Sequence, residues 1–327
     1  MIHFVVTPGH HNTLWSIIPR WKIWQAPLAA KKWTYPQLFM ARHAPPGVWV
    51  MTDLERLAPW ELRLAAEIGH IIRAAGPAYR LLNDPCVAAS RYELLLRLYE
   101  AGFNGFRAWR AEDGSCKPRF PVFLRLESDH GFPIGGLLHN AAELDRALAE
   151  LKNAAIPRRG VLVIEYQAEP LADGNFRKYA AYRIGDKIVA DHMVHEDNWN
   201  AKFGSQSAWS PERFHDEEVY VQSNPHKHDL MRAFEIAEID YGRADYGIVD
   251  GQIQIWEINT NPFLPAGKVK AAQPLRRTAT KVSKANRIAA LKSLMTTAPG
   301  RPVALQSEFL DIHRRRQRLP QRDIIRP

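Results

Sequence analysis

The sequence predicts a mixed α/β fold, because short apolar strands alternate with segments whose apolar residues recur at helical spacing. Ile2–Thr7 and Val161–Gln167 are apolar runs of strand length that end at polar or turn-forming residues. Trp60–Ala75 has apolar residues three and four positions apart and stops at Gly76-Pro77, as an amphipathic helix does. With 327 residues, of which 46% are hydrophobic, the chain is long enough for two or three lobes with their own cores.

Composition excludes several classes of protein. The sequence has no run of about 18 uncharged apolar residues, so it predicts no membrane span. The segment Met1–Val6 lacks the basic and apolar regions of a signal peptide and predicts a first strand instead. Cys86 and Cys116 show neither metal-ligand spacing nor a disulfide framework. We therefore expect a cytoplasmic protein.

The net charge of +9 is unevenly distributed along the chain. From Lys268 to the end there are 15 Lys and Arg against 3 Asp and Glu, a net charge of +12, which leaves −3 for residues 1–267. Such a basic tail can dock nucleic acid or a partner, or can be a solvated helix or a homodimer contact. We expect a helix at Ser283–Met295 that packs on the preceding lobe, and a free end from Arg314 onward.

A predicted β-hairpin carries the strongest functional signal. Its strands are Arg243–Val249 and Ile253–Pro262, joined by the turn Asp250-Gly251. Because side chains alternate along a strand, four residues of the second strand are expected on one face: Ile253, Ile255, Glu257 and Asn259. Asp245 can lie opposite them. Three hard oxygen donors on a rigid hairpin form a partial shell for Mg²⁺, which fills its octahedron with waters and substrate phosphates.

The order Arg243-Ala-Asp245, hairpin turn and Glu257-Ile-Asn259-Thr-Asn-Pro262 closely resembles the metal-binding end of the ATP-grasp superfamily. That superfamily includes D-alanine–D-alanine ligase and the glutamate-adding peptide ligases. The resemblance implies that Asp245, Glu257 and Asn259 hold one or two Mg²⁺ ions against the phosphates of ATP. It also implies a catalytic role for Arg243, facing the reacting phosphoryl or acyl-phosphate group.

The same resemblance implies an α+β ATP-grasp architecture. A small N-terminal α/β lobe, residues 1–82, would precede two sheet-and-helix lobes that clamp ATP between them, residues 83–267, with a hinge near 165–169. A basic C-terminal helix and tail, residues 268–327, would follow.

The chain from about Tyr79 to Pro262 keeps the family's order of strands, turns and charged positions. Three features would bind the phosphates. They are a basic residue at a helix start, a strand that ends in Arg125 where the family usually has Lys-Pro, and a Gly-bearing loop at 128–136. The strand Val161–Gln167 resembles the hinge whose backbone meets adenine and whose acid meets the ribose hydroxyls. The residues implied for ATP binding are Arg91, Arg125, His130, Gly131, Glu165, Tyr166, Gln167 and Glu169.

Two charged stretches lie between the hinge and the hairpin. The resemblance places Arg177 near the phosphates or the acyl substrate, in a catalytic role. Asp191–Asp197 contains His192 and His195, which would point to opposite faces of a strand and so disfavour a zinc site. We expect this cluster to line the pocket of the acceptor substrate or to be a plain polar strand end.

The resemblance implies an ATP- and Mg²⁺-dependent ligase acting on small-molecule carboxylate and amine substrates. The carboxylate would be activated as an acyl-phosphate, which an amine or similar nucleophile then attacks. Two alternatives stay open: an ATP-grasp phosphotransferase acting on a hydroxyl group, and a non-enzymatic nucleotide-binding protein whose basic tail docks a partner or nucleic acid. No Walker A, serine-elbow or His-Glu-x-x-His sequence competes for the site.

Overall fold

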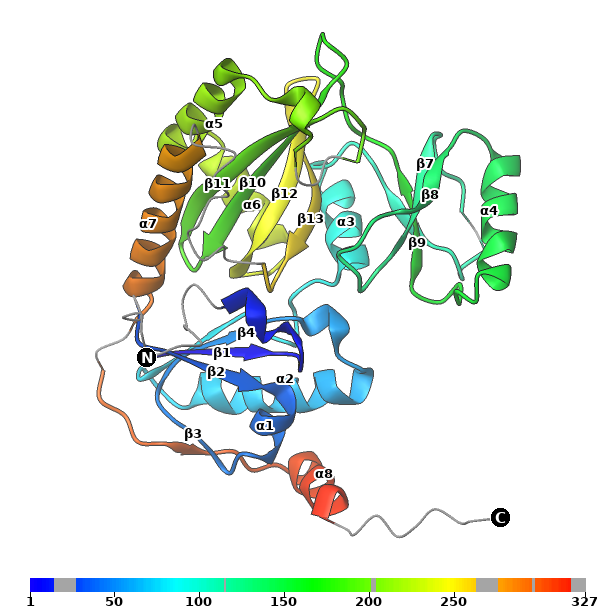
Figure 1. Cartoon of the computed structure of the whole chain (residues 1–327). Helices are drawn as coiled ribbons and strands as arrows, with labels where there is room; N and C mark the ends of the chain where they lie inside the picture. Colours follow the sequence, from blue (N-terminus) through cyan, green and yellow to red (C-terminus); the bar gives the residue numbers. More distant parts are fainter. Residues whose placement is uncertain (15–27, 115, 201–203, 263–275, 296–297, 319–327) are drawn as a thin grey trace.

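Three four-stranded β-sheets, each at the centre of one lobe, organise the part of the chain that the structure describes (Figure 1). The structure is a computed structural model. It describes residues 1–14, 28–114, 116–200, 204–262, 276–295 and 298–318. The fold is therefore mixed α/β, as the sequence predicts. None of the helices within these ranges is long and apolar enough to cross a membrane.

The N-terminal lobe contains a parallel sheet in the order β2-β1-β4-β5. Its strands are β1 (Ile2–Val6), β2 (Ala30–Thr34), β4 (Gly47–Met51) and β5 (Tyr79–Leu82). Strands β1 and β4 are buried throughout, as expected for apolar strands covered on both faces. The helices of this lobe are α1 (Tyr35–Met40) and α2 (Pro59–Ala74). The sequence predicted β1 and α2 but not the half-exposed edge strand β2, whose Lys31 and Lys32 break the apolar pattern.

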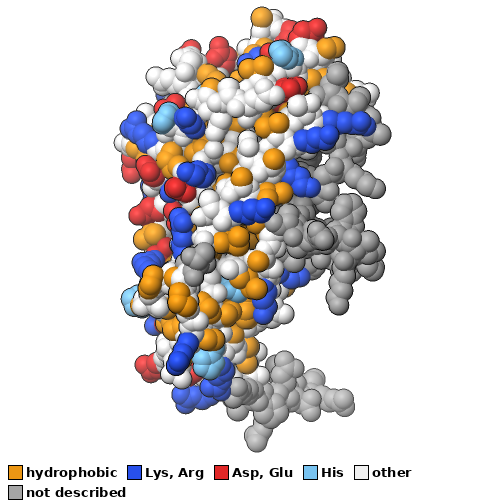
Figure 2. Space-filling model, turned by 90° about the vertical axis from the view of Figure 1, so that its left-hand side faces the viewer, with side chains coloured by type: hydrophobic (Ala, Val, Ile, Leu, Met, Phe, Trp, Pro, Cys, Tyr) orange, Lys and Arg blue, Asp and Glu red, His pale blue; other side chains and the backbone are white. Residues whose placement is uncertain are grey.

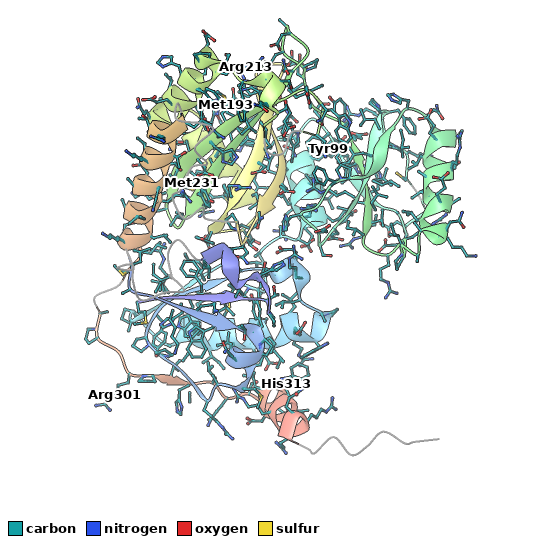
Figure 3. All side chains as sticks on the ribbon, in the orientation of Figure 1. Tyr99, Met193, Arg213, Met231, Arg301 and His313 are labelled. Atoms are coloured by element: carbon teal, nitrogen blue, oxygen red, sulfur yellow. The ribbon has the colours of Figure 1, made fainter. Side chains whose placement is uncertain are left out.

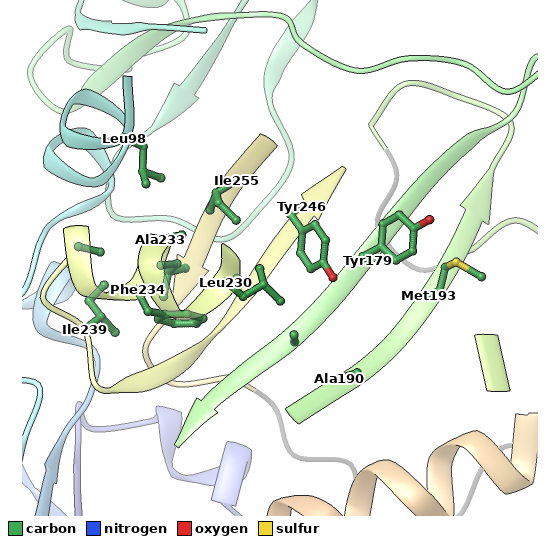
Figure 4. Close-up of a cluster of buried hydrophobic side chains, with 14 of the residues drawn as sticks. Leu98, Tyr179, Ala190, Met193, Leu230, Ala233, Phe234, Ile239, Tyr246 and Ile255 are labelled. Carbon is green, nitrogen blue, oxygen red and sulfur yellow. The ribbon is translucent and has the colours of Figure 1, made fainter. Parts of the chain in front are cut away.

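The central lobe contains an antiparallel sheet in the order β11-β10-β12-β13. Its strands are β10 (Phe176–Ile184), β11 (Lys187–Glu196), β12 (Tyr241–Val249) and β13 (Gln252–Asn259). One face packs against α3 (Arg91–Glu100), α5 (Pro211–Ser223) and α6 (Lys227–Ile236). Tyr179, Met193, Tyr246 and Ile255 point into this core beside Phe234 (Figure 4). The N-terminal lobe and the functional site lie on the other face.

The third lobe contains a smaller antiparallel sheet in the order β6-β9-β7-β8, with α4 (Ala141–Asn153) packed on it. Its strands are β6 (Ala108–Arg110), β7 (Val122–Leu126), β8 (Ile134–Leu138) and β9 (Val161–Glu165). The side chain of Asn140 caps α4, because it accepts a hydrogen bond from the backbone N–H of Glu143. The chain leaves β9 through residues 166–175 and enters β10 of the central lobe.

Two strands of the central sheet, β11 and β13, each carry one extra residue. Asp245 pairs with Glu257 but Tyr246 pairs with Ile255, so Trp256 is a β-bulge in β13. A bulge turns consecutive side chains toward one face. Ile255 and Ile258 therefore pack in the helix-side core, while Trp256 and Glu257 both face the opposite side. The expectation that Ile253 and Ile255 share a face with Glu257 is wrong for this reason.

The C-terminal region packs back along the molecule. Helix α7 (Arg277–Ser293) lies beside β11 and α5, and Ala290, Leu291 and Leu294 join a core that includes β1 and β10 residues. The predicted packing of this helix is confirmed. Figure 2, which views the molecule from the side of α7, shows Lys and Arg side chains spread over this face among apolar and polar ones. The boundary predicted between residues 267 and 268 lies outside the described residues.

The segment after α7 is not free. Strand β14 (Val303–Ala304) pairs with β3 (His43–Ala44), and α8 (Glu308–Arg318) packs beside α1. His313, labelled in Figure 3, lies on α8. Its ring stacks on that of Trp60, with centroids 5.5 Å apart. Arg314 is buried and donates to the carbonyl oxygens of Phe39 and Leu305 at 2.9 and 2.8 Å. The predicted free end is therefore wrong through Arg318, and residues 319–327 lie outside the described ranges.

Candidate active site

A cleft of about 770 Å³, counting its open mouth, lies between the central sheet and the third lobe. One end is apolar and lies beside the hinge; its side chains are Phe106, Phe123, Ile164, Tyr166 and Trp256. The other end is charged; its side chains are Arg125, His130, Lys178, Asp245 and Glu257. The cleft can therefore hold a flat apolar group at one end and an anionic group at the other.

Asp245 and Glu257 lie directly opposite each other on β12 and β13. The Asp245 carboxylate accepts hydrogen bonds from Nε of Arg243 at 3.0 Å and from Nζ of Lys178 at 3.1 Å. Burial opposes ionisation, but Arg243 and Lys178 outweigh it and lower the pKa of Asp245. This carboxylate is therefore ionised at neutral pH.

The Glu257 carboxylate collects basic groups from two other elements. Its Oε2 atom accepts from Nη2 of Arg91 at 2.9 Å and from Nη2 of Arg125 at 2.7 Å, and His130 Nδ1 lies 3.4 Å from Oε1. Burial again opposes ionisation, but Arg125 and Arg91 hold the pKa of Glu257 well below its usual range. The two opposed acids are thus both charged and both neutralised by basic side chains.

Helix and loop geometry place these basic groups. Arg91 is the first residue of α3, whose Ser90 cap accepts from the N–H of Glu93. Arg91 also donates to the carbonyl oxygens of Leu126, at 2.8 Å, and Asp129, which ties α3 to the loop after β7. Gly131 of that loop lines the cleft, and its carbonyl oxygen accepts from Arg125. The structure therefore brings Arg91, Arg125, His130 and Gly131 together, and their role in binding ATP stays a prediction.

His130 connects all three lobes. Its Nε2 atom lies 3.0 Å from Oε1 of Glu55 in the N-terminal lobe, and its Nδ1 atom faces Glu257 of the central sheet. Burial lowers the pKa of His130, but the hydrogen bonds to Glu257 and Glu55 outweigh burial and raise it. No local pattern in the sequence marks Glu55, because it lies in an ordinary turn after β4.

The donor set fits a hard divalent cation. Asp245 and Glu257 present ionised oxygens, and Asn259 follows on β13 opposite Arg243, with its Oδ1 accepting from the N–H of Asn261 at 2.8 Å. Carboxylate and amide oxygens are the ligand type that Mg²⁺ takes from proteins. Within the described ranges no three His, Cys, Asp or Glu side chains form a metal-binding group. A cation here would be held by two carboxylates and one amide.

Arg177 lies outside the set of residues that line the cleft, and its predicted catalytic role stays a prediction. It lies on the same face of β10 as the core residue Tyr179, donating to Tyr179 Oη and His195 Nε2 at 3.1 Å. Side chains alternate, so its neighbour Lys178 faces the cleft and bonds Asp245. Sequence reasoning missed Lys178 because the order of two adjacent basic residues does not reveal which one faces the core.

The hinge residues Tyr166 and Gln167 line the apolar end of the cleft. The carbonyl oxygen of Gln167 accepts from Trp256 Nε1 at 3.0 Å, so the hinge is fixed to β13. Trp199, from the loop after β11, meets the rings of Phe123 and Tyr166 with centroids 5.2 and 5.8 Å away. No pattern around Trp199 predicted that it would cover the cleft.

The two acids predicted for ribose binding are placed differently from each other. Glu165 lines the cleft, but its oxygens accept from the backbone N–H groups of Arg107 and Arg119 and from the Arg119 guanidinium, at 2.7 to 3.3 Å. Glu169 accepts from the N–H of Asp250 at 3.1 Å and lies outside the set of residues that line the cleft. The ribose role stays a prediction.

The end of the hairpin is fixed to the N-terminal lobe through Asp53. This residue has a left-handed backbone, φ 56°, and its N–H donates to Thr260 Oγ1 at 3.0 Å. Its Oδ2 atom accepts from Asn261 Nδ2 at 3.0 Å and from the N–H of Thr7 at 2.9 Å. His10 lies 3.3 Å from the other oxygen. The polar residues after Asn259 thus hold the C-terminal end of β13 against the N-terminal lobe.

No protein-family model matches this sequence, and no curated protein matches it. Among solved structures, the chain is similar to D-alanine–D-alanine ligase of Bacillus anthracis in complex with ATP, at 9% identity and TM-score 0.45, covering 89% of this chain and 98% of that one. It is similar to L-amino acid ligase of Bacillus licheniformis at 10% identity and TM-score 0.43, covering 89% and 74%. It is also similar to the ATP-grasp ligase PsnB complexed with a precursor variant, Mg and ADP, at 13% identity and TM-score 0.44, covering 86% and 97%.

Proposed function

We propose that this protein is an ATP-grasp ligase that uses ATP and Mg²⁺ to activate a carboxylate for attack by an amine. The observation that carries the proposal is the division of the cleft. Its apolar end adjoins the hinge, and its charged end presents two opposed carboxylates, each bonded to basic side chains. Adenine suits the first environment, and a metal-bound triphosphate suits the second.

Arg91, Arg125 and Lys178 are the groups that we assign to the phosphates. Each donates to a carboxylate oxygen of the charged end, so each is already oriented into the site. Phosphate oxygens can take over these hydrogen bonds, because charge-assisted donors pair with carboxylate and phosphate alike. The carboxylates released in this exchange become free to hold a cation.

Asp245, Glu257 and Asn259 would hold Mg²⁺, one ion or two. When bound, the ion supplies neutralisation of the negative charge that gathers on the phosphates during transfer. The fit rests on the donor atoms: two ionised carboxylates in direct cross-strand register and one amide oxygen on the same strand. Lys178 and Arg243, bonded to Asp245, keep that carboxylate in place.

Arg243 is assigned to the reacting centre. In the first step, a carboxylate oxygen attacks the γ-phosphorus, the bond to the β-phosphate oxygen breaks, and an acyl-phosphate and ADP form. Catalysis of such a step requires placement and preorganised positive charge more than a protein nucleophile. Burial acts against the charge of Arg243, but Asp245 outweighs it and raises the pKa of Arg243, so the guanidinium stays charged.

The experiment is a trapping assay. The protein is incubated with ATP, Mg²⁺, hydroxylamine and, one at a time, a panel of L- and D-amino acids and dipeptides. An acyl-phosphate reacts with hydroxylamine to give a hydroxamate, which is measured together with ADP and inorganic phosphate. We expect hydroxamate and phosphate in equal amounts with at least one carboxylate. ADP with a stable phosphorylated product and no hydroxamate would instead establish a phosphotransferase.

The wider setting of the activity stays a prediction. Small carboxylate and amine substrates are part of the proposal. A homodimer, nucleic-acid binding through the basic C-terminal residues and a cytoplasmic location are expected from the sequence alone.

A further inference from the structure

A β-bulge in β11 places an acid and the histidine that follows it on the same face of the sheet, whereas consecutive residues of a regular strand face opposite sides. His192 pairs with Ala180 and Ala190 pairs with Ala181, so Asp191 is the extra, unpaired residue of the bulge. Ala190 and Met193 both point into the helix-side core (Figure 4), which leaves Asp191 and His192 between them for the other face. Their side chains are bonded, with His192 Nδ1 2.8 Å from Asp191 Oδ2.

Asp191 is held so that it orients this histidine. Its Oδ1 atom accepts from Ser283 Oγ of α7 at 2.7 Å, and Arg287 Nε of the same helix lies 3.5 Å away. Burial opposes its ionisation, but Arg287 and His192 outweigh burial and lower the pKa of Asp191. An ionised carboxylate only accepts hydrogen bonds, so Nδ1 of His192 is the donor.

The free atom of this pair is Nε2 of His192. In neutral imidazole whose Nδ1 carries the hydrogen, Nε2 carries the lone pair. Among the described residues no hydrogen-bond partner is recorded for it, and the side chain is 23% exposed. A histidine whose inner nitrogen is fixed by a carboxylate and whose outer nitrogen is free is the arrangement that activates nucleophiles in many enzymes.

His192 lies in the same row of the sheet as the metal-binding acids. Across four strands the row is His192, Ala180, Asp245 and Glu257. Neighbouring strands are about 4.8 Å apart, so the Cα atoms of His192 and Asp245 are separated by roughly 10 Å, with the buried Ala180 between them in the row. Arg243 is one row further along the same face. A bound acyl group with its attacking amine can span such a separation.

We propose that His192, oriented by Asp191, is the base that takes a proton from the amine substrate in the second half of the reaction. This inference rests on the proposed ligase function. The amine enters as an ammonium group, and one proton passes to Nε2. The freed electron pair forms the N–C bond to the acyl carbon. The C–O bond to phosphate then breaks, and phosphate leaves with the electron pair of that C–O bond. A second proton from the nitrogen goes to the departing phosphate.

The test separates the two half-reactions with two nucleophiles. Hydroxylamine is neutral near pH 7 and needs no base, whereas an amino-acid amine must first lose a proton. We compare hydroxamate formation with amide formation, using the carboxylate identified in the trapping assay and the amino-acid panel as amines. The variants are His192→Gln and, as a matched control on the core-side face of the same strand, His195→Gln. Melting temperatures check that both variants fold.

We expect His192→Gln to keep wild-type hydroxamate formation and to lose roughly 10²-fold in amide formation, the usual size of a general-base contribution. His195→Gln should keep both. Added imidazole should restore part of the amide formation of His192→Ala, which a purely structural role would not allow. Equal loss of both products, or unchanged amide formation, would overturn the assignment of His192 and leave the ligase standing. A wild-type protein that forms no hydroxamate with any carboxylate would overturn the ligase proposal itself.

Discussion

Lys178 Nζ lies 3.1 Å from Oδ2 of Asp245, so a basic side chain of β10 reaches across to an acid of β12 inside the cleft. Its neighbour Arg177 points away, into contact with His195 and Tyr179. Two adjacent residues of the same charge therefore have different environments, and they form a matched pair for mutation.

Replacing Lys178 with Ala should lower kcat/KM for ATP by roughly 10²–10³, because one preorganised positive group facing the transferred phosphoryl is lost. Arg177→Ala removes the same charge from the opposite face of the strand and should leave kcat/KM near the wild-type value. Steady-state rates of ADP formation measure both. Equal losses in the two variants would show that charge near the strand, and not placement in the cleft, matters.

Glu257→Gln should abolish Mg²⁺-dependent turnover and also destabilise the fold. The amide cannot neutralise the buried Arg91 and the half-buried Arg125, which both donate to Glu257 Oε2. Leaving buried charges uncompensated costs about 3 kcal/mol or more. ADP release and urea unfolding measure the two effects. Glu238→Gln, which removes a carboxylate whose side chain is 51% exposed, serves as the control and should change neither.

Stability should fall as the pH is lowered from about 6.5 to about 4, partly through His3. Burial lowers the pKa of His3 to about 4, and its Nδ1 atom accepts a hydrogen bond from Trp33 Nε1 at 3.2 Å. Between the folded pKa and the unfolded pKa of about 6.5, the unfolded chain binds more protons than the folded one, so acid favours unfolding. Melting temperatures across this range measure the effect. His3→Gln should flatten the dependence, and a slope identical to that of the wild type would contradict the prediction.

Arg314→Ala should destabilise the protein by about 2–3 kcal/mol. The guanidinium is buried and donates to the carbonyl oxygens of Phe39, Ala41 and Leu305, which would lose their partner. Arg316, two residues later on α8, is exposed, and its replacement by Ala should stay within about 0.5 kcal/mol. Chemical unfolding of the two variants makes the comparison. Equal stability of both would mean that α8 does not hold the N-terminal lobe.

Local patterns in the sequence predicted much of this fold and the juxtaposition of Asp245 and Glu257. Apolar runs marked β1 and β9, and the Asp250-Gly251 turn, with positive φ at both residues, marked the β12–β13 hairpin. The acids Asp245 and Glu257 followed from that hairpin, because cross-strand partners of a two-residue turn are fixed by register.

What the sequence did not predict depends on contacts between distant segments or on a single extra residue. The bulges at Asp191 and Trp256 shift side chains from one face to the other, and no local composition marks them. Whether Arg177 or Lys178 faces the cleft depends on which of the two lies on the core-side face of β10. Arg314 reads as part of an exposed basic run, and only its packing against Phe39 and Leu305 places it inside.

The most direct test of the central claim is calorimetric titration of the protein with ATP, with Mg²⁺ and then with EDTA in its place. The claim is that Asp245 and Glu257 hold a cation that completes a nucleotide site in the cleft. We predict that ATP binds at least tenfold more tightly with Mg²⁺, and that Asp245→Asn removes this difference while Arg177→Ala preserves it. Identical affinities with and without Mg²⁺ in the wild-type protein, or the same Mg²⁺ dependence in Asp245→Asn, would contradict the account.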